Sequence, residues 1–496
     1  MNAFFRRAMA TLCLMAMFLA PQCFAQVPAN YKEAPSPSAG VPGWKPATPQ
    51  DARLRGKWWE IFNNPELNAL EDELNIDNQN IKQYFDNFMQ ARAIVAEARA
   101  PYYPTITTSP SYVISHPSAA GAAGGSSGSS GSSKTTSLLT IPADVSWAPD
   151  LFGKVRDAVR VAEANAQLSE ADLENEKLLE QATLAMYFFE LRGQDALIKL
   201  YDDTIQADQK SLDLARARYE TGVDTELSVI EAQNTLENAQ ASAINLGIAR
   251  AQYEHAIATL IGKTATGFSL PVKPMLTPPP PIPIGVPSEL LERRPDIAAA
   301  ERAMAAANAQ IGVDRAAFYP TLTLSGEGGL AASLISHLFS LPSFLWSLGA
   351  QLFQTIFEGG LRRATVNQGI ATYNASLDSY RQTVLTAFQQ VEDYLAQLRI
   401  LSEQLLMQRL AQQSAQKFLD LEIARYKEGI DPYLDVVVAE TTLLGDEQTV
   451  TSLQIQETVA AVQLIEAIGG GWDVSQLPTP DQVARPLTKE ETQIRR

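Results

Sequence analysis

The sequence predicts a mostly α-helical protein with the strands of a membrane β-barrel, built from two copies of a unit that runs helix, β-hairpin, long helix, helix. Three observations predict this class. The stretch 217–224 recurs as 424–431, so that each residue lies 207 positions after its counterpart, and such a fixed offset indicates an internal duplication. Each copy contains a helical pattern far longer than a globular helix. Each also contains two segments in which apolar and polar residues alternate.

The N-terminal segment 1–25 has the pattern of an export signal. Arginines precede an apolar run over 8–20, and the small residues that lead to Ala25 match a signal-peptidase site, so we expect cleavage after Ala25. The alternative is a lipoprotein anchor on Cys23, although Gln22 before it is larger than the usual lipidation box accepts.

The composition excludes several classes of protein. The chain of 496 residues has a formal net charge of -17, which argues against nucleic acid as a partner. Both cysteines, Cys13 and Cys23, lie in the export signal, so a chain cleaved after it has no disulfide and no cysteine-bound metal. No later apolar run reaches about 18 residues, so no spanning helix is predicted. If the protein crosses a membrane, it must do so through a closed set of strands.

The two copies are expected to lie between a leader and a tail. A Pro-, Ala- and Ser-rich leader covers 26–64 and is expected to be extended. The first repeat follows over 65–270, a Pro-rich linker over 271–287, the second repeat over 288–472 and a C-terminal tail over 473–496. The tail is rich in proline and charge, and it is expected to be disordered or wrapped around the helices.

Each repeat opens with a helix and continues with two strands. Apolar stripes predict one helix over 65–100 and its counterpart over 288–317. Alternation then predicts strands at about 104–116 and 137–148 in the first copy, and at about 320–331 and 343–356 in the second. A Gly/Ser tract over 121–133 is expected to form a flexible loop between the first two strands.

Each repeat ends with a long helix, a tip and a returning helix. The long helices are expected over 154–218 and 360–426, and the tips over 219–225 and 427–434. A helix over 154–218 would be roughly 98 Å long, so it needs a partner along its whole length. The first helix of the repeat and the returning helix over 226–261, stacked end to end, match that length.

Both tips carry the pattern Tyr-x-x-Gly-x-Asp. Gly222 and Gly429 are placed to take the left-handed conformation that ends a helix, and Asp224 and Asp431 are placed to cap the helix that follows. These tips are either ordinary helix corners or parts of a gate. The pattern itself leaves both interpretations open.

Four strands of roughly ten residues per chain have the length that crosses an outer membrane when tilted. Because four strands cannot close and open edges in lipid are costly, several chains would have to share one barrel. Dimers, trimers and tetramers would give eight, twelve or sixteen strands, and the periodicity does not choose between them.

At this point the residues resemble a family. The segment 290–297, Leu-Leu-Glu-Arg-Arg-Pro-Asp-Ile, and the segment 318–322, Phe-Tyr-Pro-Thr-Leu, resemble the signature of the TolC-like outer-membrane factors, in the efflux branch that includes OprM. The resemblance implies a homotrimer in the outer membrane, with a twelve-stranded barrel continued by a periplasmic α-helical barrel. It implies docking to a periplasmic adaptor (membrane fusion protein) and an inner-membrane pump, with drugs or other small molecules passing outward. The alternatives are the outer-membrane channel of a protein secretion system and a soluble coiled-coil adaptor.

The resemblance also implies roles for the tips. The second tip would bend inward and close the periplasmic mouth, and its predicted gate residues are Arg425, Tyr426, Asp431, Tyr433 and Asp435. One branch of the family carries an arginine where this chain has Asp431, so the closing contacts are expected to differ and to use Arg425. In a trimer each tip carboxylate becomes a ring of three, which can raise its pKa through like-charge repulsion. The predicted adaptor contacts are Arg218, Gly222, Asp224, Glu226 and Gly429.

An enzyme has little support in the sequence. The histidines are His116, His255 and His337, and none has a second histidine at metal-ligand spacing. No Gly-x-Ser-x-Gly nucleophile elbow is present. We therefore predict no catalytic residue, no metal site and no cofactor.

Overall fold

A computed structural model describes residues 56–116, 135–276, 278–282 and 293–485. The export signal with Cys23, most of the leader, the Gly/Ser tract and the end of the tail lie outside these residues. So does the start of the family signature, at 290–292.

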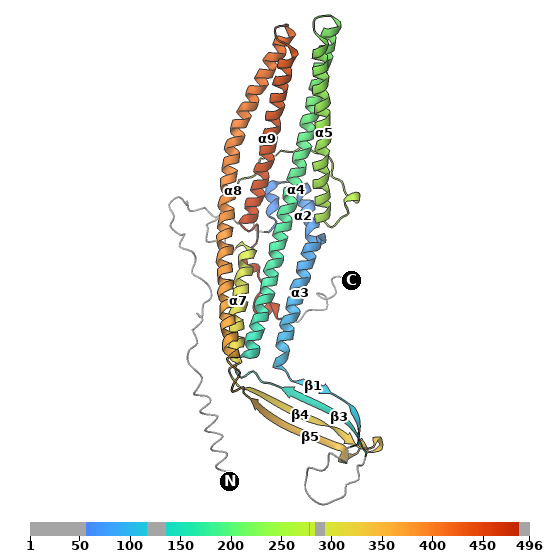
Figure 1. Cartoon of the computed structure of the whole chain (residues 1–496), viewed down its shortest axis with the longest axis vertical. Coiled ribbons are helices and arrows are strands. Elements are labelled where there is room, and N and C mark those ends of the chain that lie inside the picture. The colour runs from blue at the N-terminus through green and yellow to red at the C-terminus, as the bar shows by residue number, and fades with distance from the viewer. Residues whose placement is uncertain (1–55, 117–134, 277, 283–292, 486–496) are drawn as a thin grey trace, which may run out of the picture. The chain divides into compact units, whose positions relative to one another are not determined.

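The predicted fold class is confirmed, since the order helical segment, strands, long helix and returning helix occurs twice (Figure 1). The first repeat contains α2 (Pro65–Asp77), α3 (Gln79–Arg99), β1 (Thr105–Thr108), β2 (Ser111–Ser115), β3 (Thr136–Trp147), α4 (Lys154–Glu220) and α5 (Glu226–Leu260). The second contains α7 (Pro295–Ala316), β4 (Thr321–Ala332), β5 (Phe344–Phe353), α8 (Leu361–Lys427) and α9 (Tyr433–Ala467).

The long helices α4 and α8 have 67 residues each. Gly153 and Gly360, both with positive φ, directly precede them, a conformation that glycine adopts without a steric cost. Helix α4 packs against α3 and α5 along successive parts of its length and against α7 and α9 of the second repeat, while α8 packs against α7 and α9. Among the described residues, no helix combines the length and the hydrophobicity needed to cross a membrane.

The expected single helix over 65–100 is wrong, because it breaks at Asn78. The backbone of Asn78 is extended, with φ -60° and ψ 129°, and its side chain accepts a hydrogen bond from the amide of Ile81 at 3.0 Å. Its amide nitrogen donates to the carbonyl of Leu260 at 2.9 Å, at the end of α5. Asn78 therefore caps α3 and ties the junction of α2 and α3 to the end of the returning helix.

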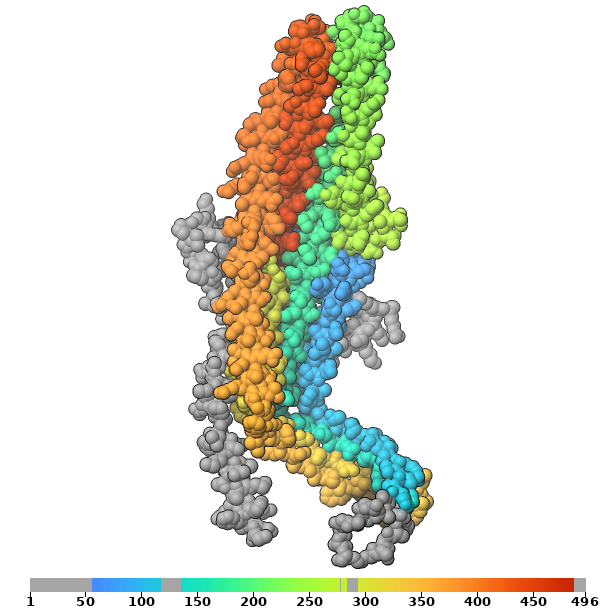
Figure 2. Space-filling view, in the orientation of Figure 1, coloured from blue at the N-terminus to red at the C-terminus, as the bar shows by residue number. Residues whose placement is uncertain are grey.

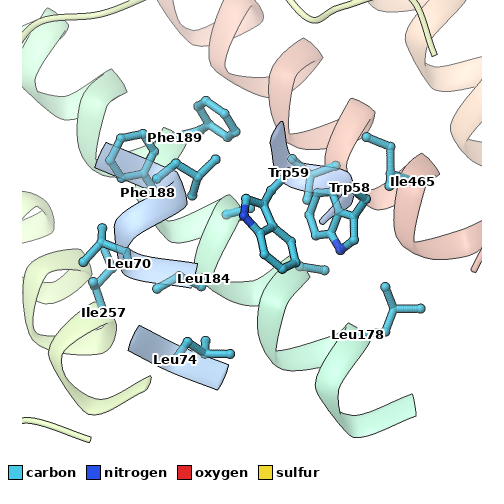
Figure 3. Packing of buried hydrophobic residues seen from close by; sticks show 14 of the residues in the cluster. Trp58, Trp59, Leu70, Leu74, Leu178, Leu184, Phe188, Phe189, Ile257 and Ile465 are labelled. Atoms are coloured by element: carbon cyan, nitrogen blue, oxygen red, sulfur yellow. The ribbon is translucent and has the colours of Figure 1, made fainter. Parts of the chain in front are cut away.

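The expected extended leader is wrong at its end, because Trp58–Phe62 form the 3₁₀-helix η2. Trp58 and Trp59 are 1% and 3% exposed, and they pack in the largest apolar cluster of the described residues. Figure 3 shows the two rings among residues of α2, α4, α5 and α9, including Leu74, Leu184 and Ile465. Burying two tryptophans here anchors the start of the described chain to both repeats.

The strands form one antiparallel sheet in the order β1-β3-β4-β5, with β2 also paired to β3. The expected strand over 104–116 is interrupted between β1 and β2 at Pro110, which has no amide hydrogen to donate. The last strand ends at Phe353, short of the expected 356. The pairing of β3 with β4 joins the hairpins of the two repeats.

The first part of the C-terminal tail is ordered and lies on the helices. It contains η8 (Val474–Gln476) and α10 (Pro480–Val483), and Val483 is 1% exposed among Val95, Ala162 and Ala166. Of the two expectations for the tail, the wrapped one holds for residues 473–485.

A buried ionic network clamps the start of the linker to α4. The carboxylate of Asp195, 0% exposed, accepts hydrogen bonds from Arg192 at 2.8 Å, from Arg250 at 2.7 Å and from the amide of Lys273 at 2.9 Å. Arg192 also donates to Glu66 at 2.6 Å. The network joins α2, α4, α5 and the linker, so its charges compensate one another in the interior.

Asp195→Ala should destabilise the protein by about 3–5 kcal/mol, because it leaves buried guanidinium groups without their shared carboxylate. The matched control is Asp203→Ala on the same helix, whose ion pair with Lys199 is more than half exposed and is worth less than about 1 kcal/mol. The measurement is chemical unfolding of the full-length protein in detergent. Equal losses in the two variants would contradict the assigned role of the network.

Candidate functional site

The two tips have the same backbone geometry. In the first, the amide of Gly222 donates to the carbonyl of Tyr219 at 2.9 Å and the amide of Val223 donates to that of Arg218 at 2.9 Å. In the second, Gly429 and Ile430 make the same pair of bonds, to Tyr426 and Arg425, at 3.0 Å each. Both glycines have φ of 72°. This is the Schellman ending predicted from the glycine positions.

Three contacts of Arg218 and Tyr426, which we call the tip lock, join the first tip to the second. The hydroxyl of Tyr426 donates to Asp224 Oδ2 at 2.6 Å. Arg218 donates from Nη1 to the carbonyl of Lys427 at 2.9 Å, and its guanidinium lies 4.7 Å from the centre of the Tyr426 ring. Figure 2 shows the ends of the two hairpins against each other. The predicted gate residue Tyr426 and two predicted adaptor contacts therefore belong to one cluster.

Asp224 does not cap α5 in the expected way. Its Oδ1 accepts from the Ser228 hydroxyl at 2.7 Å and from the Thr225 amide at 2.8 Å, and the residue at the cap position is Thr225. Burial opposes ionisation of Asp224, but the hydrogen bonds from Tyr426, Ser228 and Thr225 outweigh it, so its pKa lies below the usual value. Burial and the bond to Asp224 together raise the pKa of the Tyr426 hydroxyl. The lock is therefore a neutral phenol donating to a carboxylate.

An apolar cluster supports the lock from below. Tyr426 and Tyr433 are 3% and 2% exposed, with ring centres 5.3 Å apart in an edge-to-face arrangement. The cluster draws on all four helices of the tips, with Leu212, Ala215, Ala232, Leu236 and Val436 as its other buried members. Tyr433, a predicted gate residue, thus holds Tyr426 in place through packing.

Arg425 contacts its own tip and not the first one. It donates from Nη2 to Asp431 Oδ1 at 2.9 Å and from Nε to Asp431 Oδ2. This bidentate pair holds the pKa of Asp431 below its usual range. The expectation that Arg425 makes a closing contact does not hold within one chain, where Arg218 makes the contact between tips.

Glu422, which the sequence analysis missed, joins Asp431 and the predicted gate residue Asp435. Carboxylate oxygens of these three residues lie within 4.8 Å of one another. Loss of hydration raises the pKa of Glu422, and the charge of Asp431 adds to this. Glu422 lies three residues before Arg425 on the same helix face, and this spacing was the sequence signal that could have placed it beside the Arg425–Asp431 pair.

The remaining predicted residues lie on the surface. Gly222, Glu226 and Gly429 are exposed, and Glu226 is in the first turn of α5. None of them takes part in the tip lock. The predicted rise of carboxylate pKa concerns rings formed by several copies; inside one chain the pKa of Asp224 and that of Asp431 are both lowered.

The fold is that of outer-membrane channels. It superimposes on the structure of the outer-membrane channel OprN with a TM-score of 0.78 and 27% identity, over 87% of this chain and 98% of OprN. The chain belongs to the outer membrane efflux protein family, whose model matches residues 70–263 and 286–470. It is an outer-membrane exit channel for efflux with a periplasmic extension, and the family consists of channels.

Two relatives cover nearly the whole chain. The toluene efflux pump outer membrane protein TtgC of Pseudomonas putida is 29% identical over 87% of this chain and 88% of TtgC. The pyoverdine export outer membrane protein OpmQ of Pseudomonas aeruginosa is 30% identical over 85% of this chain and 89% of OpmQ. Both names describe outer-membrane proteins of export systems.

Gly429→Ala should loosen the second tip, because a side chain at φ of 72° costs about 1–2 kcal/mol. Amide hydrogen exchange at residues 426–431 should become several times faster. The control is Gly445→Ala within α9, where an added Cβ meets open space and alanine favours the helix. Unchanged exchange at the second tip would show that the glycine is not required there.

Proposed function

We propose that three copies of this chain form the exit duct of a tripartite efflux pump and that the second tip, 427–434, is the moving part that closes its periplasmic mouth. The observation that carries the proposal is the hydrogen bond from Tyr426 to Asp224. It joins the two hairpins of one chain at residues that lie 202 positions apart.

The uncovered surfaces of one chain support association with further copies. The sheet has two outer edges, one made by β1 and β2 and one by β5, whose backbone groups have no partner strand among the described residues of one chain. Open edges of this kind are costly in lipid. Helix α8 also exposes a row of large apolar side chains that an adjacent copy would cover: Leu385, Ile400, Leu406, Met407, Leu410 and Leu421. Three copies, as the family resemblance implies, join their sheets edge to edge.

Opening would require the second tip to leave the first. The tip lock and the Tyr433 packing hold the closed position, and the Arg425–Asp431 pair keeps the second tip rigid as it moves. The carboxylates Glu422, Asp431 and Asp435 would then form rings around the axis and favour cations over anions in the narrow mouth.

The transported compounds are small organic molecules in this proposal. The names of TtgC and OpmQ specify toluene and pyoverdine, which supports a channel for small molecules over one for secreted polypeptides. The chain acts as a duct without catalysis. The exposed tip residues Gly222, Glu226 and Gly429 are the proposed adaptor contacts.

Tyr426→Phe combined with Asp431→Ala should raise single-channel conductance in planar bilayers. The first change removes a hydrogen bond to a carboxylate, worth about 1.5–3 kcal/mol, so the closed-to-open equilibrium should shift by roughly tenfold or more. The control is Tyr219→Phe, at the equivalent position of the first tip, where the ring is 46% exposed. Unchanged conductance in the double variant would remove the gate assignment.

Glu226→Lys should weaken crosslinking to the adaptor several-fold, because it reverses a charge on the exposed surface of the first tip. Arg218 and Arg425 are unsuitable for this test, since their charges serve the tip lock and the second tip. The control is Glu237→Lys, an exposed residue further along the same helix. If both variants crosslink to the adaptor as strongly as the unmodified protein, the adaptor binds another surface of this chain.

A further inference from the structure

Two acidic side chains lie in the seam between the hairpins, below the tip lock. Asp208 on α4 is 2% exposed, and Glu440 on α9 faces it from the other hairpin. Ser211, one turn along α4 from Asp208, donates from its hydroxyl to Glu440 Oε1 at 3.0 Å. Asp208 Oδ2 and Glu440 Oε2 are buried and have no hydrogen-bond partner among the described residues. The α4–α9 seam therefore encloses two carboxyl groups whose oxygens are only partly satisfied by hydrogen bonds.

No described cation pairs with either group. The arginines of the tips are committed elsewhere, Arg218 to the tip lock and Arg425 to Asp431. Two ionised carboxylates in one dry seam would lose their hydration and repel each other, whereas a protonated carboxyl is a hydrogen-bond donor and carries no charge. The closed seam is therefore stable when the two carboxyl groups are neutral and is destabilised when they are ionised.

The groups around this pair add no positive charge. From α9, Tyr433 faces the pair, since burial and the charges of Glu440 and Asp208 all raise the pKa of its hydroxyl. From α8, Tyr426 packs on Tyr433, and α5 contributes the apolar Ala232 and Leu236 to the same cluster.

The next charged groups along the seam are Asp203 on α4 and Glu447 on α9. Burial raises the pKa of Glu447, and the charge of Asp203 raises it further. Asp203 is the partner of Lys199 in an exposed ion pair.

We propose that Asp208 and Glu440 form a proton-operated brace between the two hairpins, which holds the tips together while the pair is protonated and releases them when both groups ionise. The brace acts on the tip lock through Tyr433, whose hydroxyl lies close enough to Glu440 and Asp208 for their charges to add to burial in raising its pKa. Tyr433 in turn packs on Tyr426. The inference rests on the proposed function, since it supplies a signal that opens the proposed gate.

The sign of the pH effect follows from the two states. In the closed seam, burial raises the pKa of Asp208 to about 6 and, together with the charge of Asp208, that of Glu440 to about 7. In an open, hydrated seam both values return toward the ordinary value of about 4. The closed state therefore binds more protons. The brace is complete below about pH 4, weakens as the pH rises above that value, and is lost as the pH passes through about 6 to 7.

The test measures the distance between the tips of the full-length protein at pH 5.5 and pH 7.5. Spin labels are attached to cysteines introduced at the exposed positions Glu220 and Lys427. Double electron–electron resonance then gives the distribution of distances between the two labels. Raising the pH over this range should shift the ratio of open to closed tips by roughly tenfold to a hundredfold, because both groups release their protons. Asp208→Asn with Glu440→Gln, which keeps both shapes and removes both charges, should stay closed at both values. Asp213→Asn, at an exposed acid of the same helix, should respond like the unmodified protein.

The proposal is overturned if the unmodified protein shows no change with pH, or if the double variant responds as strongly as the unmodified protein. If the double variant does not fold, Glu440→Gln alone should lose most of the response, because Glu440 has the higher pKa. Tyr426→Phe with Asp431→Ala, labelled in the same way, distinguishes the two hypotheses. A longer distance between the tips at both pH values in that variant supports the proposed gate independently of the brace. An unchanged distance in that variant contradicts the gate and leaves the brace to be judged by the other variants.

Discussion

Helices α4 and α8 are too long to be stable without apolar cover along their whole length, and the rest of the structure supplies that cover. The stacked helices α3 and α5 cover α4 in turn, and α7 and α9 cover α8 and the second side of α4. At the break between α2 and α3, Asn78 bonds the end of α5, so the junction lies where the returning helix stops. The buried tryptophans at the start of the described chain fill the junction, where both repeats meet.

The two tips of the duplicated unit agree in their backbones and differ in their side chains. Their backbones are the same, down to the glycine φ of 72°. Their side chains differ: the first tip presents Asp224 and Arg218 toward its neighbour, and the second presents Tyr426. A phenol bound to a carboxylate, with a guanidinium against the ring, is a specific contact that is exposed to water at its edge. Such a contact holds two rigid hairpins together and can still be broken.

Charge is arranged differently at each level of the hairpins. At the second tip, Arg425 compensates Asp431, so this acid stays ionised. In the seam below, no cation of the described part of the chain pairs with Asp208 or Glu440, so burial favours their neutral forms. In the core, Asp195 is shared by two arginines. Of these three sites, the pair in the seam is the one that lies between parts that are proposed to move.

The sequence by itself determined the duplication, the element order, the long helices within two residues at each end and the glycine-terminated tips. These features depend on local periodicity and on the conformational freedom of glycine, and both are determined by residues that are close together in the sequence. Three features were missed: the 3₁₀-helix at the end of the leader, the helix break at Asn78 and the strand break at Pro110. At each of them a tertiary contact or a single residue overrode the sequence pattern. Which side chains meet was decided only by the tertiary structure, as for Tyr426 and Asp224, 202 residues apart. Over helices of 67 residues, a small difference in residues per turn rotates the far end to another face. The partners of Arg218, Tyr426, Asp208 and Glu440 therefore follow from the packing of the four tip helices and not from any local pattern.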